Sequence, residues 1–148
     1  MDTVDARKTD EWFANLDSAL ADRIPDYLII SHLEPDHAAN IARFAEKYPT
    51  AKLVLTAKAK AMLPQFFDIA NLNDRCMTVA EGDTLNLGTH ELQFILAPMV
   101  HWPEVMVEYE KTEKVLFSAD AFGKFGALSS DEEWLPEARR YFLNIVGK

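Results

Sequence analysis

The chain has 148 residues, 49% of them hydrophobic, which is enough for one domain with a substantial core. Its net charge of −9 and its pI near 4.8 argue against a nucleic acid or an anionic membrane as a partner. No apolar run approaches the roughly 20 residues that span a bilayer, and no signal peptide opens the chain. The single cysteine, Cys76, excludes an intrachain disulfide and a thiolate metal cluster. We therefore expect a cytoplasmic protein with Cys76 as a structural thiol.

The first half of the chain alternates helical and strand-like segments. Thr56 is predicted to be the N-cap of the third helix, and Pro64 is expected to kink or split that helix. The apolar spacing predicts helices over residues 10–21, 38–48 and 57–67, and short apolar runs predict strands over residues 26–31 and 52–56.

The second half has a different character. Turn signals that contain Gly82 and Gly88 separate short segments of strand-like composition. A final helix is predicted over residues 131–146, with Ser130 as its N-cap, Glu133 at the capping-box position and Gly147 as its stop. Alternating helices and strands followed by a meander predict an α/β layered domain with a mixed sheet. The predicted strands of the meander are residues 76–80, 84–87, 90–97, 104–109 and 114–118.

The most informative stretch of the chain is His32-Leu33-Glu34-Pro35-Asp36-His37. It follows the apolar run Tyr27-Leu28-Ile29-Ile30 and holds four metal-ligand side chains in six residues. A turn that leaves the tip of a strand can direct all four toward one small volume. Neutral imidazoles and ionised carboxylates there suit a pair of divalent cations.

Two further residues follow predicted strands in the same way. His101 begins the sequence His-Trp-Pro-Glu after the strand at 90–97, and Asp120 follows the apolar run Val115-Leu116-Phe117. Because loops at strand ends carry sites on a rigid scaffold, three strand ends could converge on one point, where Asp120 could bridge two ions. A single histidine or aspartate is more often structural, and we treat His90 and Trp102 in that way, but the cluster favours a metal centre.

Taken together, these motifs resemble the metallo-β-lactamase-like domain of flavodiiron proteins. The resemblance rests on His-x-Glu-x-Asp-His at residues 32–37, on the His-Trp-Pro setting of His101 and on Leu-Phe-Ser-Ala-Asp-Ala-Phe-Gly around Asp120. It implies an αββα layered fold. Members of the wider metallo-β-lactamase superfamily usually have a histidine at the position of Glu34, and they bind two zinc ions. A carboxylate there hardens the donor set, which suits iron better than zinc.

The resemblance also implies a division of ligands and a reaction. His32, Glu34 and His101 would hold one iron, Asp36 and His37 the other, and Asp120 would bridge them. The family reduces dioxygen or nitric oxide at this diiron centre, and an FMN-containing flavodoxin-like domain, or a flavoprotein or rubredoxin-like partner, supplies the electrons. Zinc could substitute for iron.

Three departures from the family pattern qualify what the resemblance implies. The family supplies a last histidine ligand from a later segment, has several strands before the part that matches Met1, and carries a flavodoxin-like domain. We therefore expect residues 1–148 to be a single partial domain, an incomplete metallo-β-lactamase-like fold lacking N-terminal strands and a C-terminal part. Its exposed sheet surface predicts a homo-oligomer, and its ligand set predicts one good metal site and one poor one.

Two other functions stay open at this point. In a dizinc metallo-hydrolase, a metal-bound hydroxide would attack an ester, amide or phosphodiester, with Asp36 orienting the water. In a non-enzymatic module, the diiron centre would sense oxygen without turning over. Glu34 argues against the hydrolase, and the lack of a flavin domain favours the sensor.

Overall fold

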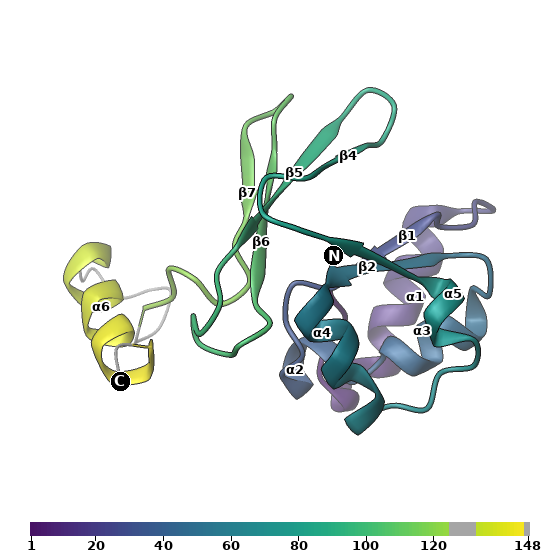
Figure 1. The fold of residues 1–148 in the computed structure, drawn as a ribbon, viewed down its shortest axis with the longest axis horizontal. Coiled ribbons are helices and arrows are strands. Elements are labelled where there is room, and N and C mark those ends of the chain that lie inside the picture. The colour runs from purple at the N-terminus through teal and green to yellow at the C-terminus, as the bar shows by residue number, and fades with distance from the viewer. Residues whose placement is uncertain (125–132, 147–148) are drawn as a thin grey trace.

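The computed structural model describes residues 1–124 and 133–146 (Figure 1). The helices in chain order are η1 (Ala6–Lys8), α1 (Thr9–Leu20), α2 (Pro35–Ala38), α3 (Ile41–Lys47), α4 (Ala57–Met62), η2 (Leu63–Gln65), α5 (Leu72–Arg75), α6 (Trp134–Tyr141) and the π-helical turn η3 (Phe142–Val146). The strands are β1 (Tyr27–Ile29), β2 (Lys52–Thr56), β3 (Cys76–Val79), β4 (Thr84–Asn86), β5 (Glu91–Leu96), β6 (Met106–Glu110) and β7 (Val115–Phe117).

The strands form two sheets. The first sheet has the order β1-β2-β3 and is parallel, and the second has the order β4-β5-β6-β7 and is antiparallel. The expectation of one mixed sheet was therefore wrong. Helices connect β1 to β2 and β2 to β3, and such crossovers make strands parallel, whereas the short turns of the second half make them antiparallel. Gly82, with a φ of 79°, lies in the tight turn where the chain passes from one sheet to the other.

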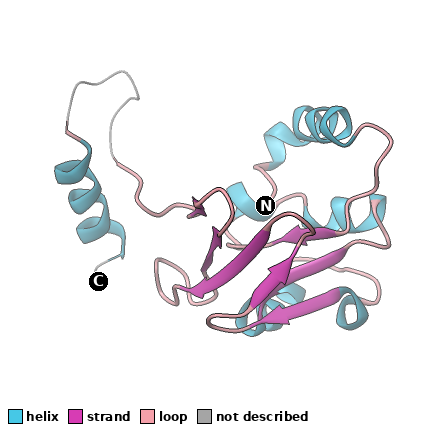
Figure 2. Cartoon of the chain, turned by 90° about the horizontal axis from the view of Figure 1, so that it is seen from above, coloured by secondary structure: helices cyan, strands magenta, loops and turns pink. Residues whose placement is uncertain are grey.

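Each face of the parallel sheet contributes to a different hydrophobic core. Leu28, Leu53 and Leu55 pack with the helices on one face. Ile29 and Val54 point to the other face and pack against residues of the antiparallel sheet. Since successive strand residues face opposite sides, a strand buried on both sides needs an unbroken apolar run, which is what β1 and β2 have. The layers are therefore helices, parallel sheet and antiparallel sheet, and α6 lies to one side of this body (Figures 1 and 2).

Two of the predicted helices are interrupted. Residues 38–48 were expected to form one helix, but α2 ends before Asn40 and α3 starts after it. Asn40 has a φ of −107° and a ψ of 9°, and its side chain donates to the Val4 carbonyl at 2.8 Å. The backbone groups at the break pair with Thr3 of the N-terminal segment: the Thr3 hydroxyl accepts from the Asn40 N–H at 3.1 Å and donates to the His37 carbonyl at 2.8 Å, in place of helical hydrogen bonds. Farther along, α4 gives way to η2, which contains Pro64, so the predicted split is confirmed. Thr56 is confirmed as the N-cap of α4, because its hydroxyl accepts from the Ala59 N–H at 3.0 Å.

The last helix starts later than predicted. α6 begins at Trp134, and Glu133 is its N-cap residue without a capping hydrogen bond from its side chain. Ser130 and Gly147, the predicted cap and stop, lie outside the described residues. Cys76 is half-buried, and burial raises the pKa of its thiol, as expected for a structural cysteine. Within the described part of the chain, none of the helices is long and apolar enough to cross a membrane.

Candidate metal centre

The first ligand-rich segment leaves the end of β1 and turns into α2. Glu34 is the N-cap residue of α2 in an extended conformation, and Pro35 occupies the first helical turn, where its missing N–H costs nothing. His32 is buried, whereas the side chains of Glu34 and Asp36 are 36% and 59% exposed. The candidate ligands that follow this strand therefore extend from the protein interior to its surface.

The other two ligand-bearing segments meet this turn from the antiparallel sheet. His101 lies in the connection between β5 and β6, and Asp120 lies just after β7. The Met106 N–H at the start of β6 donates to the Ser31 carbonyl at 3.1 Å, which fastens the second sheet to the end of β1. The two sheets therefore bring together residues almost 90 positions apart in the sequence.

Four of the predicted ligands form one group. In it, Nε2 of His101 lies 3.0 Å from Oε2 of Glu34 and 3.3 Å from Oδ2 of Asp120. Nε2 of His32 lies 3.2 Å from the same Glu34 oxygen and 3.5 Å from the same Asp120 oxygen. All four donor atoms lie within 4.8 Å of one another, so one ion could contact them all.

The remaining predicted ligands form a second group with Asp120. Nε2 of His37 lies 2.8 Å from Oδ1 of Asp120 and 3.9 Å from Oδ2 of Asp36. Asp120 therefore presents one oxygen to each group. The six residues predicted as ligands therefore lie together in two adjoining groups that share Asp120.

The spacing of the donor atoms fits metal coordination. Two atoms that are each about 2.1 Å from one ion lie about 3.0 Å apart at a right angle and about 3.4 Å apart at a tetrahedral angle. The four nitrogen–oxygen separations given above for the first group, 3.0–3.5 Å, lie close to this range. The first group has two nitrogen and two oxygen donors and the second has one nitrogen and two oxygens, so both suit a divalent cation.

Two carboxylates outside these groups hold the far side of the histidine rings. Glu104 Oε1 lies 2.9 Å from Nδ1 of His32, and Asp2 Oδ2 lies 3.1 Å from Nδ1 of His37. Because Nδ1 of each ring contacts one of these carboxylates, Nε2 faces the donor groups described above. Neither carboxylate was predicted from the sequence as a partner of a histidine. Glu104 left a faint signal, as it follows His101 by three residues, but nothing in the sequence linked Asp2 to a histidine 35 positions away.

Comparison with known proteins gives a family. Residues 6–145 match the family model described as "ODP family beta lactamase". The chain belongs to this family. The anaerobic nitric oxide reductase flavorubredoxin of Salmonella arizonae is 35% identical over 154 aligned positions, which cover 99% of this chain and 32% of the relative.

Solved structures of flavodiiron proteins also match the chain. The flavodiiron protein of Giardia intestinalis superposes with a TM-score of 0.81 at 29% identity, over 99% of this chain and 37% of that one. Rubredoxin oxygen:oxidoreductase from Desulfovibrio gigas gives a TM-score of 0.78 at 33% identity, over 98% of this chain and 37% of that one. The ODP family chain thus has the metallo-β-lactamase-like core fold of flavodiiron proteins and spans about a third of the length of these relatives.

In this ODP family chain, the imidazoles and carboxylates of the centre stabilise one another's charged forms. The hydrogen bond from His37 holds the pKa of Asp120 below its usual value, and the bonds to Asp120 and Asp2 raise the pKa of His37 to about 10. Burial lowers the pKa of His32, but the hydrogen bond and charge of Glu104 outweigh it, so the net shift is upward. A proton on His37 thus balances the neighbouring carboxylates, and a metal ion would replace that proton.

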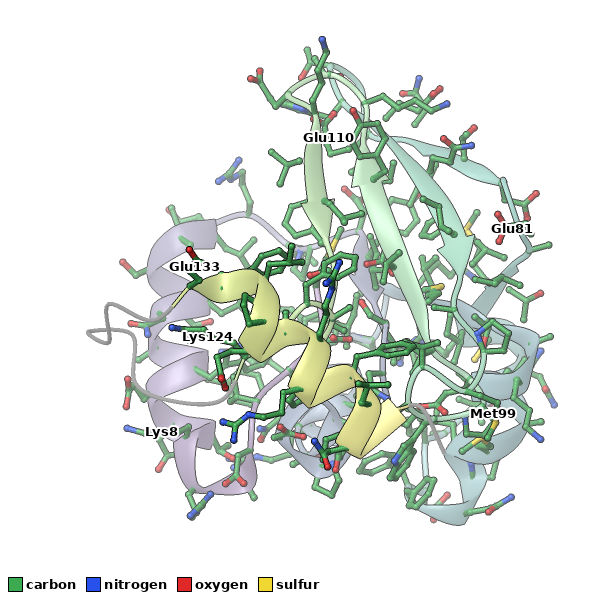
Figure 3. All side chains as sticks on the ribbon, turned by 90° about the vertical axis from the view of Figure 1, so that its left-hand side faces the viewer. Lys8, Glu81, Met99, Glu110, Lys124 and Glu133 are labelled. Carbon is green, nitrogen blue, oxygen red and sulfur yellow. The ribbon has the colours of Figure 1, made fainter. Side chains whose placement is uncertain are left out.

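An apolar cavity of about 110 Å³ borders the metal groups. His101 and Asp120 form one wall, and Tyr141 of α6 forms part of another. Burial raises the pKa of the Tyr141 phenol, and the negative charges of Asp120, Glu34 and Asp36 add to the shift, which places α6 within electrostatic reach of the centre. Figure 3 shows α6 in front of the body on this side. The cavity is lined by Val100, His101, Asp120, Ala121, Phe122, Ala138, Tyr141 and Phe142.

The two residues that were treated as structural have structural contacts. His90 pairs with Glu110 at 3.2 Å. Glu110 lies at the opposite end of the antiparallel sheet from Met99 and the neighbouring His101 loop (Figure 3). The ring of Trp102 packs edge-on against His32, with centroids 5.3 Å apart, which supports the interpretation as packing beside a ligand.

Proposed function

We propose that the chain forms the catalytic core of a flavodiiron-type oxidoreductase, which reduces dioxygen or nitric oxide at a two-iron centre. His32, Glu34 and His101 would hold one ion, Asp36 and His37 the other, and Asp120 would bridge them. The observation that carries this proposal is the shared carboxylate: Asp120 gives one oxygen to each of two adjoining donor groups.

The chemistry of the donors favours iron. The two groups together contain three imidazoles and three carboxylates. Oxygen donors suit iron better than they suit zinc, although zinc could occupy the same positions. Iron(II) ions held here would supply electrons and open coordination positions for a small diatomic molecule.

The cavity beside the centre suits such a substrate. Its lining is mostly apolar, and about 110 Å³ is room for a few molecules of the size of water. Val100, Phe122 and Phe142 would exclude bulk water from the cavity. Dioxygen and nitric oxide are small and uncharged, so they would lose little hydration free energy on entering it.

Electrons would come from another protein or domain. The names of the relatives join a flavin and a rubredoxin to this activity. We propose that the donor is a flavoprotein or a rubredoxin-like protein, that FMN binds outside these 148 residues, and that the reaction takes place in the cytoplasm. We propose also that residues 1–148 act as a single partial domain.

The second metal group is proposed to be the weaker one. It has three donors, and its Asp36 side chain is 59% exposed, whereas the first group has four donors and includes the buried His32. Water or a residue of another chain would complete it.

The chain is proposed to form homo-oligomers. In the edge strand β7, each apolar residue is about two fifths exposed. Trp134, Leu135 and Leu143, near the C-terminus, are half-exposed or more. Apolar surface of this kind is usually covered by association. Light scattering over a range of protein concentrations tests this, and a protein that stays monomeric throughout contradicts it.

The experiment for the main proposal combines metal analysis with gas consumption. The protein is loaded with iron(II) without oxygen, its metal content is measured, and dioxygen or nitric oxide uptake is followed with an added flavoprotein reductase. Sustained uptake that is lost in His32→Ala and kept in His90→Ala supports the proposal. Zinc content with ester hydrolysis supports the hydrolase, and iron with stable oxygen binding but no turnover supports the sensor. Either of these outcomes overturns the oxidoreductase.

A further inference from the structure

Glu104 lies at a point where three segments meet. It belongs to the connection between β5 and β6, and its backbone carbonyl accepts from the Thr56 hydroxyl, at the end of β2, at 3.0 Å. Its side chain reaches the end of β1, where Oε1 lies 2.9 Å from both Nδ1 of His32 and the backbone N of Leu33. The position of the carboxylate is therefore fixed from both ends.

The chemistry of this contact sets the state of the His32 ring. An ionised carboxylate only accepts hydrogen bonds, so Nδ1 of His32 must carry the proton. Nε2, on the other side of the ring, faces Glu34 and Asp120 at 3.2 Å and 3.5 Å, where an ion would take the place of any proton that this nitrogen carries. An interaction that fixes one ring nitrogen in this way decides which nitrogen is free to bind a metal.

A purely structural role does not account for a carboxylate at this position. Glu104 is 2% exposed, and among the described residues its second oxygen, Oε2, has no hydrogen-bond partner. Burying a charged group with a free oxygen is costly, and an apolar side chain of similar size would pack at lower cost. The Leu33 N–H is a single neutral donor, and a neutral acceptor would satisfy it. An imidazole that binds a cation, in contrast, becomes more basic when a charged carboxylate accepts its other N–H.

We propose that Glu104 is a positioning residue of the metal centre: it holds His32 with Nε2 toward the ion and fastens the loop of His101 to the end of β1. This inference rests on the proposed metal centre. Asp2 stands in the same relation to His37, at 3.1 Å, so each donor group contains one imidazole held by a carboxylate from outside it.

The test compares Glu104→Gln and Glu104→Ala with a matched control, Glu108→Gln. Glu108 is also fully buried and also has one oxygen without a partner among the described residues, but it contacts Ser31 and no histidine. Far-UV circular dichroism and thermal unfolding first identify the variants that fold.

The first readout needs no metal. Nitrogen-15 NMR of the histidine rings, at a pH high enough for the His32 imidazole to be neutral, reports which nitrogen holds the proton. We expect His32 to carry it on Nδ1 in the wild type, in Glu104→Gln, whose amide oxygen can still accept, and in Glu108→Gln. Glu104→Ala should shift it toward Nε2. A wild-type His32 protonated on Nε2 overturns the proposal even if Glu104→Ala does not fold.

The second readout is metal affinity. Cobalt(II) titrations followed by visible absorption, and anaerobic iron(II) titrations, should show affinity about 10- to 100-fold weaker in Glu104→Ala, a smaller loss in Glu104→Gln and wild-type affinity in Glu108→Gln. Equal affinity in the wild type and in a folded Glu104→Ala overturns the proposal. If the wild type binds neither metal, the metal centre itself is refuted, and the NMR result still decides whether Glu104 orients His32.

Discussion

Glu108 offers a quantitative test of how the two sheets pack. It lies on β6 with its side chain fully buried, and the Ser31 hydroxyl donates to its Oε2 at 3.0 Å. Burial raises the pKa of Glu108 to about 8, and the nearby charge of Asp2 adds to this, while the Ser31 bond and the N-terminal amino group oppose it. The folded protein therefore holds a proton there that the unfolded chain, with a pKa of 4.5, releases.

The size of the effect follows from the two pKa values. Because the pKa of Glu108 is raised in the folded state, binding of this proton contributes to the free energy of unfolding. That contribution is fully present below pH 4.5 and is lost as the pH rises to about 8. The loss is about 1.36 kcal/mol per pH unit, or about 3 kcal/mol between pH 4.5 and pH 7. Glu108→Gln keeps an acceptor for Ser31 and removes the titration, so the variant should exceed the wild type in stability by about 3 kcal/mol at pH 7.

Urea unfolding of the metal-free protein, followed by tryptophan fluorescence at several pH values between these limits, measures the difference. The two proteins should have similar free energies of unfolding near pH 4.5 and should diverge steadily above it. Glu46→Gln, at an exposed position on α3, is the control and should follow the wild type at every pH. A constant difference between Glu108→Gln and the wild type across this range would refute the reasoning, because a buried proton must give a pH-dependent gap.

Three other predictions concern packing, hydrogen bonding and metal. Phe94→Ala removes a fully buried ring between the sheets and should lower the free energy of unfolding by about 3–5 kcal/mol in urea titrations; a loss under about 1 kcal/mol contradicts the packing. Arg75→Met removes a guanidinium that donates to three backbone carbonyls at 3.0 Å and should cost about 2 kcal/mol in the same assay. Arg75→Lys should not restore it, since an ammonium cannot span the three acceptors. Asp120→Asn should reduce the iron content of both groups in metal analysis, whereas Asp36→Asn should affect only the second; a loss of one ion alone in Asp120→Asn argues against a bridging role.

Much of the fold was predictable because its signals are local. The strand at residues 52–56 was predicted with its observed bounds, since an apolar run between Pro49 and the Thr56 cap leaves little freedom. The split at Pro64 follows from the geometry of proline. The break at Asn40 was missed because the backbone groups there pair with Thr3, and no local pattern reports contacts across 34 and 37 positions.

The candidate site shows the same division. Its six candidate ligands were predicted from their spacing and from their positions after apolar strands, and the structure places them side by side. The sorting of the strands into two sheets was not recognised, since it depends on the connections between strands rather than on any strand alone. The roles of Glu104 and Asp2 were also missed, because a glutamate or aspartate in a sequence is far more often a solvated surface residue than a buried partner of histidine.

The sequence by itself determined the chemical inventory of this protein: the types of its candidate ligands, their order and the strands that precede them. These follow from side-chain chemistry and from periodicity, which are properties of neighbouring residues. Only the tertiary structure decided that Asp120 faces two donor groups, that Glu104 and Asp2 lie behind the histidine rings, and that a buried Glu108 keeps a proton between the sheets. Each of these depends on distances across the fold and on exclusion of water, which arise only when distant segments pack together.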